Sequence, residues 1–292
     1  MNYIQKEKLQ GYALISPLLI ILLGLIAYPF IYAIYLSFTQ KMIGKPINFV
    51  GLKNYIKLLS SPVFYQALKV SIIYTIFAVV GKLILGTVMA ELLNKSLVGQ
   101  GFLRGIMLLP WIVPTFISAY TWQWLFSDFG GLLNFLVDHL IWWKHVHIQW
   151  LSNPDMALFS VIMVNIWRGF PFIGISLLAG MQGIPNALYE SAQVDGANYA
   201  QKFIHITTPS LKTVYTVTTL LTLIWTLNDF ELVYILTKGG PINSTKLFSI
   251  LSYEYAFGSN DLGLGTTVSM IIAPLVFVLM MLGIKHMYKE DA

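Results

Sequence analysis

Long apolar stretches alternate with short polar connectors along the whole chain. A helix needs about 20 predominantly apolar residues to cross a hydrocarbon core of about 30 Å, because each residue rises about 1.5 Å. The pattern therefore predicts an all-α, polytopic membrane protein with about six transmembrane helices. The expected spans cover residues 13–38, 70–92, 102–126, 156–181, 211–236 and 262–284.

Composition agrees with a lipid environment. Hydrophobic residues make up 57% of the 292 residues and charged residues 11%, whereas a soluble domain has about 25% charged residues. The apolar stretches leave no room for a separate soluble part, so we expect a single transmembrane domain over residues 1–292. The sequence has no cysteine, which excludes disulfides, thiol catalysis and thiolate metal sites.

The net charge of +5 does not indicate a nucleic-acid partner. Lys and Arg lie mostly at the ends of the apolar stretches, where they meet lipid headgroups and water, and no basic stripe with interleaved aromatics is present. Six spans put both termini on the same side. Lys and Arg divide equally between the two sets of loops, so the positive-inside rule gives no orientation.

Enzymatic activity is not expected, and no catalytic residue is assigned. Gly81-Lys82 is followed by Leu83 and lacks the upstream glycine of a phosphate-binding loop. Neither an HExxH zinc motif nor a nucleophile elbow occurs. No metal site is expected either, because the histidines at 139, 145 and 147 have no matching set of ligands.

One polar segment stands out between the fourth and fifth spans. Residues 184–211 read IPNALYESAQVDGANYAQKFIHITTPSL. Pro185 can open a helix at its first turn, and Gly196 can close it or let it bend. The segment therefore predicts a short helix, a glycine break and a second helix that ends before Pro209. Helices of about ten residues are marginal alone in water, so these must pack against something.

The residues of this segment suit a docking surface for a partner protein. Ala192 and Gly196 are small enough to allow close approach, while Glu190 and Asp195 offer polar anchors. An interfacial helix that merely rests on the membrane is the alternative.

The segment resembles the cytoplasmic loop of permease subunits of binding-protein-dependent ABC importers. That loop carries a pattern of Glu-Ala-Ala, three residues, Gly, nine residues, Ile, one residue and Leu-Pro. The matches at the family's spacing are Glu190, Ala192, Gly196, Ile206 and Pro209, while Ser191 replaces the middle Ala and Thr208 replaces Leu. The resemblance implies that the ATPase-coupling residues are Glu190, Ser191, Ala192, Asp195 and Gly196.

Four other stretches are similar to the MalF-like permease of maltose-type carbohydrate importers. They are FVGLKNYIKLL at 49–59, LLPWIVPTFIS at 108–118, NIWRGFPF at 165–172 and LTKGGPINSTKLFSILSYEYAF at 236–257. The resemblance implies a carbohydrate substrate, a second, MalG-like permease, two ATP-binding cassette subunits and an extracytoplasmic solute-binding protein. ATP and Mg²⁺ would bind to the ATPase partner, and this chain would hold no cofactor. The implied location is the cell membrane, with the Glu190 loop and both termini cytoplasmic.

Polar residues inside the expected spans point to a transport path. A charged side chain at the centre of a bilayer costs at least about 2.5 kcal/mol, so it normally faces a cavity or a partner. Hydrogen bonding between helices is the alternative. Broken helices line cavities in membranes, and we expect Pro110 and Pro114 to interrupt the third span, and Gly169 with Pro171 the fourth. The polar residues concerned are Lys82, Asn165, Arg168, Asn228, Asp229 and Glu231.

Sugars require hydrogen bonds to hydroxyls and flat apolar surfaces for their C–H faces. The resemblance places the residues that line the substrate path at Trp111, Thr115, Asn165, Arg168, Gly169, Thr222, Trp225, Thr226 and Asp229. Arg168 and Asp229 bring charge where a neutral sugar needs none, so an acidic or phosphorylated sugar is a reasonable option.

The remaining alternative is an ion-coupled secondary carrier or a channel for small polar solutes. Such carriers often contain repeated halves, and no internal repeat is visible. Residues 184–211 would then have no role.

Overall fold

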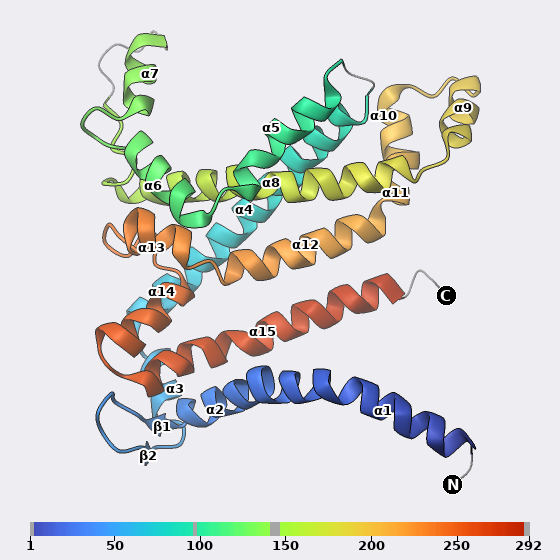
Figure 1. The fold of residues 1–292 in the computed structure, drawn as a ribbon. Helices are drawn as coiled ribbons and strands as arrows, with labels where there is room; N and C mark the ends of the chain where they lie inside the picture. The colour runs from blue at the N-terminus through green and yellow to red at the C-terminus, as the bar shows by residue number, and fades with distance from the viewer. Residues whose placement is uncertain (1–2, 96–97, 141–146, 289–292) are drawn as a thin grey trace. The chain divides into compact units, whose positions relative to one another are not determined.

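The computed structural model describes residues 3–95, 98–140 and 147–288, which are helical apart from one two-stranded sheet and the connecting turns (Figure 1). They divide into two compact units. One unit comprises residues 1–61 and 251–274, and the other comprises residues 62–250 and 275–292.

The first unit contains one long helical stretch, a small hairpin and a short helix. Its elements are α1 (Tyr3–Leu22), the π-turn η1 (Leu23–Ala27), α2 (Tyr28–Ser37), β1 (Thr39–Gln40), β2 (Asn48–Phe49), α3 (Lys53–Leu59) and the π-turn η3 (Glu254–Gly258). Helices α14 (Phe248–Tyr253) and α15 (Leu262–Tyr288) begin in one unit and end in the other.

Polar groups hold the end of α2 and the start of the hairpin against α3 and α15. The side-chain amide of Asn54 donates to the carbonyl oxygens of Ser37 at 3.1 Å and Thr39 at 2.9 Å. The Thr267 hydroxyl also donates to the Ser37 carbonyl, at 3.1 Å. A Cβ at Gly263 would lie 2.0 Å from the Thr39 carbonyl oxygen, so only glycine allows this approach.

The second unit holds the other helices. They are α4 (Pro62–Leu93), α5 (Gln100–Ile112), α6 (Thr115–Leu125), α7 (Leu132–Leu140), α8 (Pro154–Gln182), α9 (Asn186–Val194), α10 (Tyr199–Lys202), the π-turn η2 (Phe203–Thr207), α11 (Thr208–Ser210), α12 (Lys212–Leu227) and α13 (Glu231–Thr237).

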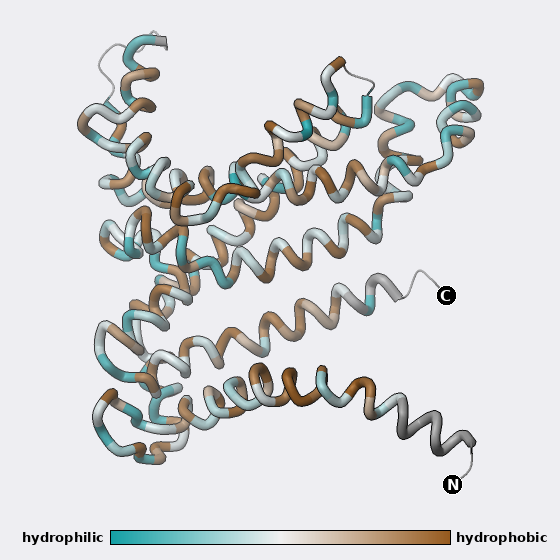
Figure 2. Tube along the Cα trace, in the orientation of Figure 1, coloured by the Kyte–Doolittle hydropathy of each residue, from teal (hydrophilic) through white to brown (hydrophobic). Residues whose placement is uncertain are grey.

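Length and hydropathy identify the membrane spans. Four helices are long and apolar enough to cross a bilayer, and the described residues hold up to six spans if two bent pairs each count as one. The prediction of an all-α membrane protein with about six spans is confirmed. Figure 2 shows hydrophobic residues along the long helices and hydrophilic residues around α9 and α10. The four unbroken spans are 11–37, 62–93, 154–182 and 262–283; the bent pairs are α5 with α6 and α12 with α13.

Proline breaks the third span once, not twice. The axes of α5 and α6 differ by 91°, because Pro114 forces the preceding Val113 into an extended conformation (φ −64°, ψ 130°). Pro110 lies inside α5 without ending it. The expected break at Gly169 and Pro171 was wrong, since α8 continues through both residues. A missing N–H in one turn is tolerated where neighbouring helices pack around it.

Helices α4 and α8 form the centre of this unit, and glycines let them approach closely. A Cβ at Gly86 would lie 2.7 Å from the Cβ of Ile173, and one at Gly174 would lie 2.5 Å from the sulfur of Met89. Lipid is as apolar as leucine, so close van der Waals packing at small residues is what holds such helices together. These two helices carry several of the polar side chains that line the cavity described below.

Candidate functional site

A cavity of about 330 Å³ lies among α4, α5, α8 and α12 and the joint that connects α12 to α13. The residues that line it are Lys82, Trp111, Asn165, Arg168, Gly169, Phe172, Thr222, Trp225, Thr226 and Asp229.

Helical spacing explains why these side chains meet. On α8 the lining positions 165, 168, 169 and 172 follow the i, i+3, i+4, i+7 rule, and on α12 positions 222, 225 and 226 follow the same rule. Asp229 comes directly after α12, whose C-cap is Asn228. One face of each helix and the bent joint therefore converge on the cavity.

The carboxylate of Asp229 organises one wall. Its Oδ2 accepts hydrogen bonds from the Tyr74 hydroxyl at 2.5 Å and from the Asn165 amide at 2.7 Å. The backbone carbonyl of the same residue accepts from the Ser249 hydroxyl at 2.6 Å. Asp229 thereby ties the α12–α13 joint to α4, α8 and α14.

Lys82 is buried and reaches the cavity from α4. Its Nζ donates to the Thr226 hydroxyl at 3.0 Å, and that hydroxyl donates to the Thr222 carbonyl at 2.6 Å. The lysine chain runs over Gly169, where a Cβ would lie 2.5 Å from the Lys82 Cε. The absent side chain at 169 leaves the space that the lysine occupies.

Several buried polar atoms of the cavity have no hydrogen-bond partner within the described residues. They are the Arg168 Nε, the Asn165 Oδ1 and the Thr222 hydroxyl. The formal charges of the lining, two cations and one anion, sum to +1. An unpaired buried polar group costs about 1–3 kcal/mol, so the cavity suits an occupant that supplies hydrogen-bond partners.

Aromatic rings supply an apolar surface beside these polar groups. Phe172 stacks with Trp111 at a centroid distance of 5.9 Å and meets Trp225 edge to face at 5.0 Å. Both indoles are about half exposed. The cavity therefore offers polar partners and flat rings together.

The structure brings together eight of the nine residues expected along the substrate path. Thr115 is not among the lining residues, because it starts α6 on the far side of the 91° bend. Asn228 and Glu231, also considered from the sequence, do not line the cavity either. Sequence reasoning left Phe172 out, although its position one turn after Arg168 could have revealed it. Lys82 was recognised as a polar residue in a span but was not assigned to the path.

The 184–211 segment projects as two short helices joined at a glycine (Figure 1). Helix α9 begins directly after Pro185 and ends at Val194 with Asp195 as its C-cap, and Gly196 adopts the left-handed φ of +80° that closes the helix. The Asn198 side chain accepts from the Gln201 N–H at 2.9 Å, while the Gln201 side chain accepts from the Asn198 N–H at 2.7 Å. This reciprocal cap starts the second helix.

The second helix does not end before Pro209 as expected. It continues through the π-turn η2 into α11, which contains Pro209. Proline has no N–H, and the wider turn places the Thr208 N–H on the Phe203 carbonyl instead. The Tyr189 and Thr207 hydroxyls, 2.9 Å apart, join the two arms of the segment.

The expected coupling residues lie on this projection. Glu190, Ser191, Asp195 and Gly196 are exposed, and Ala192 is half-buried. A hollow of about 290 Å³ opens beside Ala192, Asp195 and Gly196. The other residues that line it are Ala197, Gln201, Lys202, His205 and Ile206. Glu190 and Ser191 do not line it. The surface thus combines a small-residue hollow with the exposed carboxylate of Asp195 at its edge.

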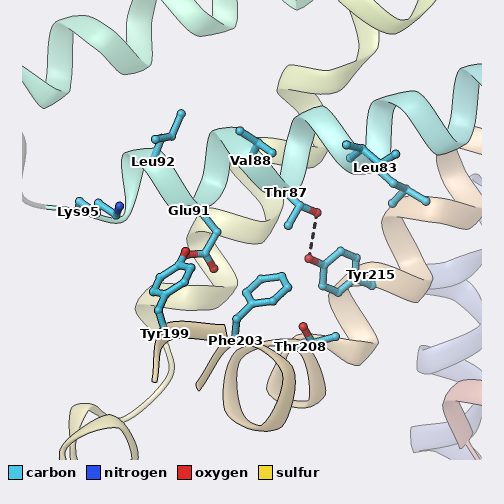
Figure 3. Close-up of a pocket in the computed structure, with 11 residues that line it drawn as sticks. Leu83, Thr87, Val88, Glu91, Leu92, Lys95, Tyr199, Phe203, Thr208 and Tyr215 are labelled. Atoms are coloured by element: carbon cyan, nitrogen blue, oxygen red, sulfur yellow. Dashed lines mark hydrogen bonds between the residues drawn. The ribbon is translucent and has the colours of Figure 1, made fainter. Parts of the chain in front are cut away.

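A larger groove of about 630 Å³ separates the end of α4 from the second arm of the segment (Figure 3). Its walls are mostly apolar, and the hydroxyls of Thr87 and Tyr215 meet across it at 3.0 Å. The lining residues are Leu83, Ile84, Thr87, Val88, Glu91, Leu92, Lys95, Tyr199, Phe203, Thr208 and Tyr215.

One polar contact closes the outer end of this groove. The Tyr199 hydroxyl donates to the Glu91 carboxylate, and the Lys95 ammonium lies 5.8 Å from the centre of the Tyr199 ring. The hydrogen bond to Glu91 raises the pKa of Tyr199 to about 12, so the phenol keeps its proton near neutral pH. The 184–211 segment is therefore fastened to α4, which also carries Lys82.

Metal ligands do not gather in the part of the chain that the structure describes, since no three His, Cys, Asp or Glu side chains there could hold an ion. Of the three histidines considered from the sequence, His145 lies outside the described residues.

Comparison with known proteins places this geometry in a family. The model of a family described as "Binding-protein-dependent transport system inner membrane component" matches residues 82–288. The trehalose/maltose transport system permease protein MalF of Thermococcus litoralis is 37% identical over 272 residues, covering 93% of this chain and 91% of the relative. The inner membrane ABC transporter permease protein YcjO of Escherichia coli is 32% identical over 274 residues, covering 92% and 91%.

A solved structure has the same fold. A chain of a bacterial ABC transporter involved in the import of the acidic polysaccharide alginate superposes with a TM-score of 0.83, covering 98% of this chain and 96% of that one. The sequence identity is 23%, so this likeness concerns the fold alone.

Proposed function

We propose that this chain, which belongs to the family of binding-protein-dependent transport system inner membrane components, is a permease subunit of an ATP-driven importer of a carbohydrate. The family is a transport component rather than an enzyme. The name of the Thermococcus litoralis relative, a trehalose/maltose permease, supports a sugar as the solute. The hydrogen-bonding groups and indole faces of the 330 Å³ cavity suit such a solute.

The proposed assembly contains a second, MalG-like permease, two ATP-binding cassette subunits and an extracytoplasmic binding protein. ATP and Mg²⁺ bind to the cassette subunits, and this chain supplies half of the path. The 184–211 segment and both termini face the cytoplasm, which agrees with an even number of spans in a multi-pass protein of the cell membrane.

The observation that carries the coupling part of the proposal is the connection between the cavity and an exposed knob, which is α9 with the Gly196 turn that follows it. Glu190 is exposed on α9, where an ATPase can reach it. The second arm of the segment is bound through Tyr199 to Glu91. Nine residues earlier on the same helix, about 13.5 Å along its axis, Lys82 lines the cavity. A displacement of the knob is thereby passed to the cavity wall through one rigid helix.

Charge reversal at Glu190 tests this proposal. The complex of both permeases and the cassette subunits is reconstituted in vesicles with the binding protein, and uptake of labelled maltose, trehalose and trigalacturonate is measured together with ATP hydrolysis. Glu190→Lys is expected to lower uptake of the transported sugar at least about tenfold. The new lysine would face the group of the ATPase that the Glu190 carboxylate is proposed to anchor, and a like-charge contact there costs of order 1.4 kcal/mol or more. The amount of folded permease should not change.

Asp138→Lys is the matched control, since Asp138 is an exposed acid on α7, away from the segment, and its uptake should equal that of the parent. Full uptake in the Glu190→Lys complex would contradict docking at this knob. Uptake by the permease in vesicles without cassette subunits would instead indicate a carrier or channel.

A further inference from the structure

We propose that the 330 Å³ cavity binds an oxyanion group carried by the transported sugar, with Arg168 as the cation that recognises it. This inference rests on the proposed function and narrows the solute to sugars that bear a carboxylate or a comparable anion.

The cavity has features of a built site rather than of loose packing. Its volume lies at the lower end of the range of about 300–1,000 Å³ that is usual for ligand pockets. Asn165 and Thr222 are 6% and 3% exposed, yet the Asn165 Oδ1 and the Thr222 hydroxyl have no partner within the described residues. Buried polar atoms without partners are unfavourable, so groups of the occupant are needed to satisfy them.

The sign of the charge follows from how the three ionisable side chains are engaged. Asp229 accepts hydrogen bonds from Tyr74 and Asn165 on one carboxylate oxygen and is the single carboxylate beside the two cations of the lining, so the lining favours an anionic over a cationic solute. Lys82 donates to Thr226. Arg168 is the cation whose buried Nε has no hydrogen-bond acceptor within the described residues.

Arg168 and Lys82 share the single carboxylate of Asp229 in a cavity of formal charge +1, so a neutral sugar would leave the guanidinium only partly neutralised. An oxyanion would satisfy it, because a planar guanidinium and a carboxylate form parallel charge-assisted hydrogen bonds. The unpaired Asn165 Oδ1 and the Thr222 hydroxyl would then be available to hydroxyl groups of the same solute.

The aromatic rings distinguish a sugar acid from a bare inorganic anion. Trp111, Phe172 and Trp225 line the same cavity, and flat rings of this kind contact the C–H face of a pyranose. An inorganic ion would use none of this surface. The occupant therefore combines an apolar ring face with an anionic group, as a uronic acid does.

Direct binding to the purified complex in detergent tests the inference, with D-galacturonate and D-galactose as probes that differ at C6. Tryptophan fluorescence reports occupancy because Trp111 and Trp225 line the cavity. The parent is expected to bind galacturonate at least about tenfold more tightly than galactose. Arg168→Gln should reduce that preference to less than about twofold, and Arg168→Lys should retain part of it.

Arg104→Gln is the matched control, because Arg104 is the other arginine of the sequence and does not line the cavity; its preference should equal that of the parent. Equal binding of the two sugars by the parent, or an unchanged preference in Arg168→Gln, would overturn the inference. Inorganic phosphate that competes as well as galacturonate would overturn the assignment to a sugar acid. Arg168→Lys keeps the test decisive if Arg168→Gln does not fold.

The two experiments distinguish a failure of the proposed anion site from a failure of the proposed coupling to the ATPase. The Glu190→Lys complex should bind galacturonate like the parent while its uptake is low. A complex that couples ATP hydrolysis to uptake but shows no preference for galacturonate would leave the proposed importer standing and overturn only the anion site.

Discussion

The crossing of α4 and α8 at Gly86 gives a prediction that can be worked out from distances. In Gly86→Ala the new Cβ would lie 2.7 Å from both Cβ and Cγ2 of Ile173 and 3.1 Å from the backbone nitrogen of Gly174. The shortest of these falls about 0.7 Å below the 3.4 Å at which ordinary contact begins. The Ile173 Cβ is fixed to the backbone, so no change of rotamer can relieve the overlap.

The two helices must therefore separate in this variant. Overpacking of this kind costs about 1–3 kcal/mol, which corresponds to a decrease of about 5- to 150-fold in the folding equilibrium. The loss should extend along the pair, because Gly174, next to Ile173, relies on the same close approach to Met89.

Unfolding of the purified protein in mixed micelles by increasing fractions of dodecyl sulfate, followed by tryptophan fluorescence, measures this loss. Gly105→Ala is the matched control, because Gly105 lies inside α5 and a Cβ there meets nothing within 4 Å. Alanine is favoured over glycine in a helix by about 0.8–1.0 kcal/mol, so this control should be unchanged or slightly more stable. If Gly86→Ala and the control unfold at the same fraction of dodecyl sulfate, α4 and α8 do not approach each other as described.

Three further substitutions probe the polar contacts. Gly169→Ala would place a Cβ 2.5 Å from the Lys82 Cε; because that chain can move, uptake should fall severalfold while the unfolding midpoint changes little. Tyr199→Phe removes the donor to Glu91 but keeps the ring, so the ATP hydrolysed per sugar transported should rise, and an unchanged ratio would contradict a fastening role. Asp229→Asn removes an anion that accepts two hydrogen bonds and should cost about 1–3 kcal/mol in the micelle titration; parental stability would show that these bonds do not support the joint.

Hydropathy predicted the membrane spans well because lipid requires long uninterrupted apolar helices. It could not predict which prolines bend them. Pro114 turns the chain by 91°, whereas Pro171 is accommodated inside α8. Both remove one N–H, and the difference depends on what packs around each residue, which a linear pattern does not contain.

The candidate cavity was largely predictable because its residues repeat at helical spacing on α8 and α12. Thr115 does not line the cavity for a reason of geometry, since a bend one residue earlier carries α6 elsewhere. Phe172 was missed because hydropathy does not distinguish it within an apolar span, and only its helical spacing from Arg168 indicates that it shares the lining face. The contact between Tyr199 and Glu91 joins residues 108 positions apart, and no local pattern indicates such a pairing.

Asp229 has a consequence for attempts to redesign the specificity of this protein. Its carboxylate and its carbonyl together fasten four elements, so altering it would disturb the scaffold along with the lining. Trp111 and Trp225 are about half exposed, and the Arg168 Nε has no acceptor among the residues that the structure describes. Libraries that vary these three positions and leave the aspartate untouched should yield new solute preferences in proteins that still fold.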